Sequence, residues 1–408
     1  MKYVFSMTLA LTLLATAPAL AQDIDVMTQN QYLGADLTPI TTAGDPIEFN
    51  TAVVEALEQV AANDFQSRAE ALAELIAKRL PALVGLQEVF IFTCNDLGPP
   101  TPEQGCDNPR IRDAFNDHLE LTLQALDALG EDYAAVATVV NFNTSNIVVP
   151  PVPFPGIPFN IDGYPALANI VDRDVILARG DIAGGATPVP FKDLQPFGIC
   201  LKDSADGCNY QIVASATLPG DVNLDIERGY VGVDVTVDEK DYRFVNTHLE
   251  VQRPSDNPLS PFIQAAQSAE LIGVLGASTP PTKSLIVVGD INSSPDDPFI
   301  PLPPNTLPPP FDQGIIPPYT QFLGSGYTDA WDLRPGAVPG YTCCQDDDLL
   351  NHQSEHDERI DVIFSWEVPS NVKKARVLGA RVSDKTSPPG HGLWPSDHGS
   401  VAAELQFQ

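Results

Sequence analysis

The segment of residues 285–295, LIVVGDINSSP, constrains the fold of this chain more than any other. Its unbroken run of branched apolar residues is typical of a strand that is buried on both faces, so other layers must cover the sheet from both sides. The run ends at Gly289 and is followed by Asp290 and Asn292, whose side chains project to the same side of the strand end. The Ser-Ser-Pro sequence that follows is typical of a turn that leaves a sheet.

A carboxylate and an amide at the end of a buried strand suit phosphate chemistry. Asp290 can orient a water molecule, and Asn292 can donate a hydrogen bond to a developing oxyanion. The alternative is an Asx-type turn, in which the aspartate only caps the backbone. The functional interpretation therefore depends on further polar clusters in the chain.

Two helix-to-strand units accompany this pattern. Apolar residues at helical spacing predict helix from 51 to 80, with a break at 63–64, and an apolar strand follows at 82–88. A helix at 261–275 similarly precedes the strand at 285. Helices that alternate with buried strands predict an α/β fold.

Polar residues also stand at the ends of other predicted strands. Asn30 ends a first strand, although alone it fits a turn better than a ligand site. Glu88 ends the strand at 82–88, where a buried carboxylate is costly unless it is paired or bound to a metal. We interpret Glu88 as a metal ligand, with a cap or salt-bridge role as the alternative. His248 follows a strand that ends in Asn246-Thr247, which makes it a candidate for phosphate contact.

Near the C-terminus, acidic residues and a histidine form a candidate acid–base group. Asp361 stands early in a strand at 358–364, and Asp397-His398 precede the last predicted strand at 401–405. Histidine titrates in the useful range, and a carboxylate can hold its tautomer and raise its basicity. Without the other clusters, the Ser-Asp-His sequence would be interpreted as a turn.

A strand at 170–179 supplies one further candidate. Asp172 and Asp174 lie on one face of this strand and Arg173 on the other. We include Asp172 because a carboxylate on this strand can reach the site. Pairing with a nearby arginine is the alternative.

The first 21 residues have the features of a secretory signal peptide. Lys2 is the only charge, an apolar run covers residues 7–14, and Ala19-Leu20-Ala21 fits a cleavage site. The apolar run is too short to span a membrane, and no other stretch is long enough. We therefore expect a chain that is secreted or periplasmic and begins near Gln22.

Six cysteines agree with an oxidising compartment. Adjacent Cys343 and Cys344 can bond to each other or pair elsewhere, because sequence alone does not fix connectivity. The other four bracket loops and are expected to pair locally as Cys94 with Cys106 and Cys200 with Cys208.

The formal net charge of −32 disfavours tight non-specific binding to nucleic acid, since phosphate backbones are neutralised by Lys and Arg. Only Lys373, Lys374 and Arg376 cluster. A cleft that holds divalent cations could reverse the sign locally. The alternative is that the acidic surface serves only solubility.

Loop insertions are expected near residues 92–112, 141–165 and 298–320, where proline, glycine and cysteine gather. Apolar spacing predicts a helix from 111 to 129, which Gly130 ends. The insertion at 141–165 is long, irregular and near the presumed site. It is therefore a candidate substrate-facing loop, with a decorative surface loop as the alternative.

Taken in order, the polar clusters resemble the motifs of the endonuclease/exonuclease/phosphatase superfamily. The resemblance runs from about residue 24 to the C-terminus and rests on five short motifs in the family's order. It implies an α/β fold with a four-layer αββα sandwich of two mixed β-sheets flanked by helices, in a single catalytic domain over residues 22–408. The motifs are Gln87-Glu88, Asn246-Thr247-His248, Gly289-Asp290-x-Asn292, Arg359-Ile360-Asp361 and Ser396-Asp397-His398.

The resemblance implies metal-assisted hydrolysis of a phosphoester, with water attacking phosphorus. Glu88 would bind the divalent cation, usually Mg²⁺, with Mn²⁺ or Ca²⁺ as alternatives. Asn30 matches the family's first-strand Asn near the metal and phosphate, and Asp397 would assist the metal or the catalytic pair. Tyr32 departs from the pattern of abasic-site endonucleases, which carry an acid at that position.

The resemblance also implies roles for the remaining candidates. His398, oriented by Asp361, would activate water. Asp290 and Asn292 would position the nucleophile and the phosphoryl oxygen, and His248 would donate to the phosphate. A histidine at position 248 is similar to the deoxyribonuclease and sphingomyelinase branches. The spacing of Asp172 to Arg179 resembles the deoxyribonuclease strand that bears a second acid.

Our leading hypothesis is an exported, metal-dependent phosphodiesterase for a small or lipid-derived phosphodiester, because the surface is so acidic. The alternatives are an extracellular nuclease and a binding module on an inactive scaffold; the intact motif set disfavours the second. A sphingomyelinase-like role would predict an apolar hairpin for membrane-surface contact, for which the loop at 151–159, with Phe154 and Phe159, is the candidate. We infer no obligate protein partner.

Overall fold

The computed structural model describes residues 22–99, 101–194, 200, 202–252, 259–303, 306–307, 309–387 and 392–407. The expected signal peptide lies outside these residues. Among the helices of the described part, none combines the length and the apolar character that a membrane span requires.

The first large sheet contains the N-terminal and C-terminal strands of the described chain. Its bounds are β1 Gln22–Asn30, β2 Leu83–Gln87, β3 Ile91–Asp96, β4 Tyr133–Asn143, β5 Ile157–Ile161, β6 Tyr164–Arg179, β19 Asn371–Leu378 and β20 Ser400–Phe407. The order is β19-β20-β1-β2-β6-β3, and β4 and β5 also pair with β6. Only β1 and β2 pair in parallel among these described strands; β20 runs antiparallel to β1.

The second large sheet contains the strand with which the sequence analysis began. Its bounds are β7 Thr187–Pro188, β8 Lys202–Ser204, β9 Gly207–Asn209, β12 Gly229–Val237, β13 Lys240–His248, β14 Ser284–Asp290, β17 Thr328–Asp329 and β18 Asp361–Ser365. The order is β17-β18-β14-β13-β12-β9-β8, with β7 beside β12. β13 and β14 are parallel, as the helix-to-strand unit predicts.

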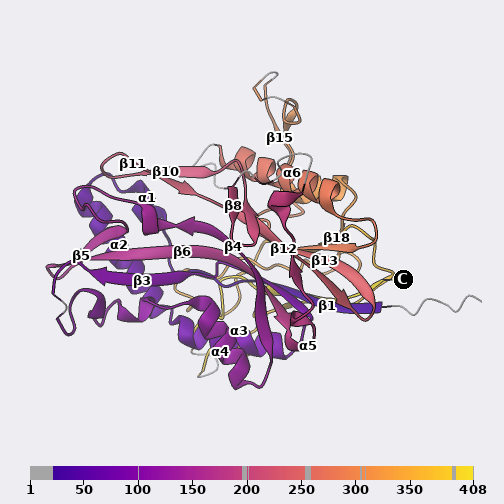
Figure 1. The fold of residues 1–408 in the computed structure, drawn as a ribbon, viewed down its shortest axis with the longest axis horizontal. Helices are drawn as coiled ribbons and strands as arrows, with labels where there is room; N and C mark the ends of the chain where they lie inside the picture. The colour runs from indigo at the N-terminus through magenta and orange to yellow at the C-terminus, as the bar shows by residue number, and fades with distance from the viewer. Residues whose placement is uncertain are drawn as a thin grey trace, which may run out of the picture.

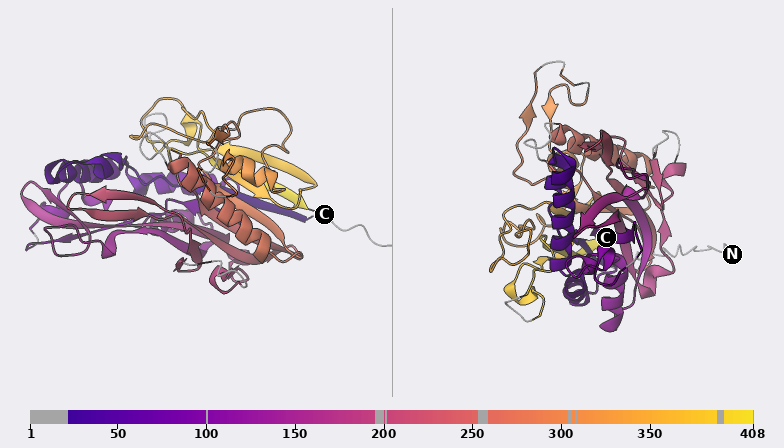
Figure 2. Two further views of the ribbon diagram at one scale, coloured as in Figure 1. Left: turned by 90° about the horizontal axis from the view of Figure 1, so that it is seen from above. Right: turned by 90° about the vertical axis from the view of Figure 1, so that its left-hand side faces the viewer.

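Helices cover the outer faces of both sheets (Figures 1 and 2). Their bounds are α1 Thr38–Thr42, α2 Pro46–Ala62, α3 Phe65–Ala77, α4 His118–Ala128, α5 Gly180–Ala183, α6 Ser260–Ser278 and α7 Pro318–Gly324. α3 and α4 share a core with the outer face of the first sheet, and α6 and α7 share one with the second. A third core lies between the sheets and contains Val26 and Leu405 from the first sheet and Val233 and Ile286 from the second. The predicted four-layer α/β sandwich is confirmed.

The predicted break in the first helix is confirmed at Asn63–Asp64. α2 ends at Ala62, and Asp64 caps α3 by accepting a hydrogen bond from the backbone of Ser67. Asp64 has a left-handed backbone (φ 33°), which Asp tolerates better than most residues. Two amphipathic helices therefore replace one long helix.

The predicted helix from 111 to 129 was too long at its N-terminal end. α4 begins at His118, because Asp117 accepts hydrogen bonds from the backbone N–H groups of Leu119 and Glu120. Residues 112–114 form a 3₁₀ turn instead. Ile111 is nevertheless fully buried, so an apolar residue at this position indicates burial and not a helix.

The three expected insertions contain more regular structure than predicted. β3 occupies the start of the first one, and the second is wrong as an irregular loop because β4 continues to Asn143 and β5 covers 157–161. An extension with its own core lies beside α1 in Figure 1. It is built from these strands, α2 and a hairpin of β10 (Ala214–Leu218) and β11 (Val222–Ile226). The third insertion holds a short pair, β15 (Ile300–Pro301) with β16 (Gly314–Ile315).

All six cysteines form disulfides within the chain. The two expected local pairs are confirmed, and they fasten the loop after β3 and the segment leading into β9. Adjacent Cys343 and Cys344 bond to each other. The pairs are Cys94–Cys106, Cys200–Cys208 and Cys343–Cys344.

Candidate active site

Strand ends of both sheets bring the polar side chains to one edge of the sandwich. Asn30, at the end of β1, pairs in register with Gln87 at the end of β2. In the other sheet, His248 ends β13 opposite Asp290 of β14, and Asp290 lies opposite Asp361 at the start of β18. Because parallel neighbours end at the same edge, these polar groups gather where the two sheets face each other.

Asn30 joins the two sheets at the centre of the site. Its buried amide nitrogen donates to Glu88 Oε1 (3.1 Å) and to Asp290 Oδ2 (3.1 Å). Its amide oxygen accepts from the backbone N–H of Tyr32 (2.9 Å). One amide therefore fixes a carboxylate from each sheet.

Glu88 lies just past the end of β2, where the backbone turns. Its φ of 55° is left-handed, which is uncommon for a residue with a side chain and is found most often where structure is over-determined. Oε2 accepts from the backbone N–H of Leu33 (2.9 Å), so the carboxylate is fixed at both oxygens by groups at the end of β1.

Asp397 supplies a second carboxylate near Glu88. Burial raises the pKa of Asp397 to about 6; the charge of His398 opposes this shift and that of Glu88 adds to it. The two carboxylates repel each other, and carboxylate oxygens are the hard donors that Mg²⁺, Mn²⁺ and Ca²⁺ prefer. Glu88 and Asp397 are thus of the residue type that would hold a divalent cation, and Asn30 fixes Glu88.

His398 and Asp361 lie side by side, as the sequence predicts. His398 Nδ1 lies 2.9 Å from Asp361 Oδ2, and both side chains are buried. Burial alone would lower the pKa of His398. The carboxylates of Asp361, Asp397 and Asp290 outweigh burial and hold that pKa well above its usual range. Since Nδ1 faces Asp361, Nε2 is the nitrogen left for chemistry.

Asp290 lies between the pair and Asn30. Its Oδ2 is 3.7 Å from His398 Nε2, and its Oδ1 accepts from the backbone N–H of Asn292 (2.9 Å). Burial raises the pKa of Asp290 to about 7; the charge of His398 opposes this and that of Asp361 adds to it. Asp290, Asp361 and His398 each offer a ligand atom within 4.8 Å of the others, so this group has the composition and spacing of a metal site as well as of a proton-transfer site.

His248 is a neutral hydrogen-bond donor. The Arg228 guanidinium lies 3.1 Å from Nδ1, and a guanidinium can only donate. Nδ1 must therefore accept, which leaves the proton on Nε2. Burial and then the charges of Arg228 and His398 lower the pKa of His248 well below its usual range. Nε2 lies 3.4 Å from Asp290 Oδ2 and faces the site.

Asn292 directs its amide at the same place. Its Nδ2 lies 3.1 Å from His248 Nε2 and 3.0 Å from the backbone oxygen of Leu249, to which it donates. The backbone is left-handed (φ 48°), a conformation that Asn adopts more readily than most residues. The turn after β14 thus places both Asp290 and Asn292 beside His248.

Asp172 lies behind His248 rather than against it. The carboxylate is buried, 3.5 Å from Arg228 Nη1, and so the alternative of an arginine partner holds. Burial raises the pKa of Asp172 to about 6; the charge of Arg228 opposes this shift and the charge of Glu88 adds to it. Asp172 therefore borders the site through its ion pair with Arg228 and the nearby charge of Glu88.

Sequence reasoning missed two arginines. Arg228 left no local signal, because its partners come from other strands. Arg68 stands on the buried face of α3 between Phe65 and Leu72, which a helical projection could have revealed. Its guanidinium ties the exit of β1 to the loop before β20 through backbone oxygens of Gln31, Tyr32, Asn63 and Pro395.

Comparisons with known proteins concern the fold. No family profile and no curated protein matches the chain. Similar solved structures include an endonuclease/exonuclease/phosphatase from Beutenbergia cavernae, with 17% identity, 94% of this chain and 72% of that chain covered, and a TM-score of 0.47. An endonuclease/exonuclease/phosphatase family protein from Bacteroides thetaiotaomicron has 14% identity and a TM-score of 0.47, and the match covers 95% of this chain and 99% of that chain. A mannosyl-6-phosphatase from Bacteroides thetaiotaomicron has 14% identity and a TM-score of 0.46, and the match covers 94% of this chain and 100% of that chain.

The predicted site residues, apart from Asp172, lie together at one edge of the two-sheet sandwich. Each comes from a strand end or from the turn beside it. The chain therefore has the two-sheet α/β fold that its sequence predicts, with the ordered motifs gathered at one edge of it.

Proposed function

We propose that this chain is a divalent-metal-dependent phosphoester hydrolase, and specifically a phosphodiesterase for a small or lipid-derived phosphodiester. The observation that carries the proposal is the buried His398–Asp361 pair at 2.9 Å, next to the carboxylates of Glu88, Asp290 and Asp397. A cation held by Glu88 and Asp397 would polarise a phosphoryl oxygen and offset the carboxylate charge that favours protonated His398.

His398 takes the proton from the attacking water in this proposal. Asp361 holds the ring through Nδ1, so Nε2 accepts the proton. Asp290 lies 3.7 Å from Nε2 and orients the water toward phosphorus. The surrounding carboxylates stabilise the imidazolium that forms, which favours proton removal as the water attacks.

His248 and Asn292 bind the non-bridging oxygens of the phosphate. The Nε2–H of neutral His248 faces the site, and the Nδ2 of Asn292, which donates to the backbone oxygen of Leu249, lies 3.1 Å from that nitrogen. Arg228 behind His248 keeps that histidine from acting as a proton acceptor at Nδ1. The developing charge on the phosphoryl oxygens thus meets preorganised donors.

A small or lipid-derived substrate is preferred because the net charge of −32 repels a polyanion. A nuclease remains the enzyme alternative. For membrane-surface contact, Phe154 is 54% exposed, whereas Phe159 is buried in the extension, so only Phe154 of the two is available. Export to the periplasm or medium is supported by the three disulfides.

The test is hydrolysis of bis(p-nitrophenyl) phosphate by residues 22–408, with Mg²⁺, Mn²⁺ or Ca²⁺ and with EDTA. We expect metal-dependent turnover, and a fall of about 100-fold or more in kcat for His398→Ala, because general-base catalysis contributes about 10²–10⁴-fold. p-Nitrophenyl phosphate, sphingomyelin and single-stranded DNA in parallel separate monoester, lipid and nucleic-acid substrates. Turnover that survives EDTA or His398→Ala would contradict the mechanism, and inactivity with every substrate would favour a binding module.

A further inference from the structure

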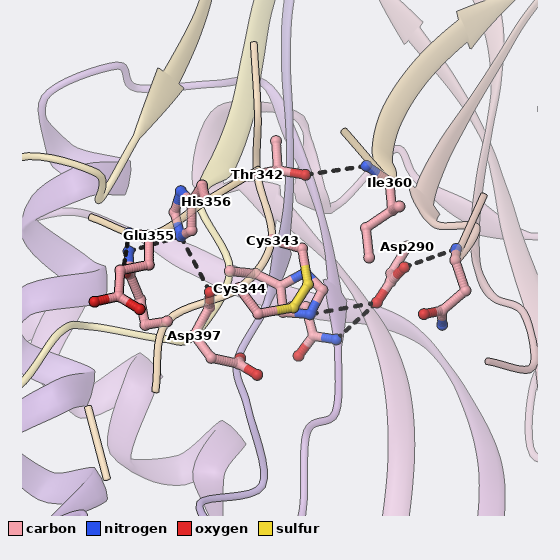
Figure 3. The surroundings of a disulfide bond; sticks show 12 residues. Asp290, Thr342, Cys343, Cys344, Glu355, His356, Ile360 and Asp397 are labelled. Carbon is pink, nitrogen blue, oxygen red and sulfur yellow. Dashed lines mark hydrogen bonds and ion pairs between the residues drawn. A yellow bond between two sulfur atoms is a disulfide. The ribbon is translucent and has the colours of Figure 1, made fainter. Parts of the chain in front are cut away.

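A disulfide between adjacent residues lies inside the catalytic machinery. Figure 3 shows Cys343–Cys344 with Asp290 on one side and Asp397 on the other. The two sulfur atoms and a ring nitrogen of His398 lie within 4.8 Å of one another. The bond therefore lies close to the proposed general base.

The segment that carries the disulfide is attached to the strand of Asp361. The backbone N–H groups of Thr342 and Cys343 donate to the oxygen of Glu358 (2.6 and 3.1 Å). The hydroxyl oxygen of Thr342 accepts from the backbone N–H groups of Ile360 and Asp361 (3.2 Å each). These bonds fix the start of β18, where the partner of His398 stands.

The same segment is attached to the loop that carries His398. The backbone N–H of Gly399 donates to the oxygen of Thr342 (2.7 Å), and that of Gln345 donates to the oxygen of Asp397 (2.9 Å). His356 Nε2 also lies 3.1 Å from that Asp397 oxygen and 2.7 Å from the Gln345 amide (Figure 3 labels His356 and Asp397). Thr342 and Gln345 thus hold the His398 loop from both sides of the disulfide.

The two cysteines differ in their access to solvent. Cys343 is 7% exposed, whereas Cys344 is exposed. The disulfide closes a covalent ring that contains buried Cys343 and exposed Cys344, so the backbone between the two residues cannot rotate freely. A small-molecule reductant can nevertheless approach from the side of Cys344.

We propose that the Cys343–Cys344 disulfide is a positioning element of the active site, which holds His398 against Asp361 and in register with Asp397. This inference rests on the proposed function. Breaking the bond lets Cys344 move and loosens the connection between Thr342 and Gln345, so the two catalytic segments lose their fixed spacing. A displacement of about 1 Å at a reacting group can cost about 100-fold in rate.

Reduction by a dithiol provides a reversible form of this change. In dithiothreitol, two S–H groups are oxidised to a cyclic disulfide. The Cys343–Cys344 bond breaks, and the two hydrogens end on the cysteine sulfur atoms. An oxidising dithiol/disulfide couple reverses the reaction and restores the bond.

The test compares C343A/C344A with a matched control, C94A/C106A, whose disulfide lies in the loop after β3. We expect kcat for bis(p-nitrophenyl) phosphate to fall at least about tenfold in C343A/C344A, with KM changed by less than about threefold, because positioning acts on the transition state. C94A/C106A should keep the wild-type kcat. Dithiothreitol should lower kcat in the wild type and the control, reversibly on reoxidation, but not further in C343A/C344A.

The kinetic outcomes separate positioning from mere stability. Equal kcat losses in both double variants, or a loss that follows the unfolding midpoint, would overturn the inference. An unchanged kcat in C343A/C344A would overturn it as well.

A second readout does not need turnover. If the wild type hydrolyses no phosphoester, the proposed function fails, and the imidazole signals of His398 in NMR spectra still report its position. Those signals should shift in C343A/C344A and not in C94A/C106A. Unshifted signals in both variants would overturn the inference on their own.

Discussion

At the residue scale, two histidines in one site are assigned opposite roles by their neighbours. Burial, and then the charge of Arg228, keep His248 neutral, whereas three carboxylates favour the charged form of His398. Their surroundings therefore push the two pKa values apart. An interpretation from residue type alone would treat the two rings as equivalent.

A half-buried glutamate outside the site gives a pH-dependent prediction. Burial raises the pKa of Glu270 on α6 from 4.5 to about 7, although its Oε2 accepts from the backbone N–H of Gln211 (3.1 Å). Because the folded pKa is raised, the associated stability is complete below pH 4.5 and is lost as the pH rises through 7. Glu270→Gln should therefore gain about 1 kcal/mol over the wild type above pH 7, a value discounted for partial exposure.

Urea unfolding at pH 4, 6 and 8 measures this difference. Glu120→Gln, at an exposed position of α4, serves as the control and should follow the wild type at each pH. A gain for Glu270→Gln that is equal at pH 4 and pH 8 would contradict a titration origin.

At the element scale, α3 contributes more than a covering layer. Arg68 is 1% exposed and points inward, where backbone oxygens from three separate segments accept its N–H groups. Burial lowers its pKa to about 10, so the side chain stays charged near neutral pH. The helix thereby fixes the exits that carry Asn30 and Asp397.

Replacing Arg68 should destabilise the fold and the site together. Arg68→Met leaves several buried carbonyl oxygens unpaired, and we expect a loss of about 3–5 kcal/mol in the free energy of unfolding. Arg68→Lys keeps the charge with fewer donors and should lie between Met and the wild type. Chemical denaturation gives the values. A loss below about 1 kcal/mol for Arg68→Met would show that water replaces the guanidinium.

Elements with one dominant local pattern could be predicted from the sequence, and those that depend on distant partners could not. The strand at 285–290 and its polar end follow from an unbroken apolar run. By contrast, β5 lies in a proline-rich stretch and forms only because β6 offers it an edge. α4 starts late because the cap of Asp117 outweighs the apolar residues before it. Arg228, just before β12, contacts His248 at the end of β13, and no local sequence pattern encodes this contact.

At the scale of the whole molecule, the site lies across a seam between two sheets. Asn30 is the hydrogen-bonded link between Glu88 of the first sheet and Asp290 of the second. The net charge of −32 adds general repulsion, which a cation bound among carboxylates would relieve locally.

Metal binding should therefore stabilise the folded chain. At about 100 times its Kd, Mg²⁺ or Mn²⁺ should add about 2.7 kcal/mol to the free energy of unfolding, and Glu88→Gln should remove most of that gain. Calorimetry or thermal unfolding gives the shift, with NaCl at matched ionic strength to correct for screening. An equal gain in Glu88→Gln would assign the effect to screening of the overall charge instead.

The antiparallel pairing of β1 with β20 has a consequence for biosynthesis. Asn30 and His398 lie near opposite ends of the described chain, so a growing polypeptide contains Asn30 long before it contains His398. The last strand must then insert beside the first before the reactive centre exists. The site between the two sheets therefore stays incomplete until β20 has paired with β1.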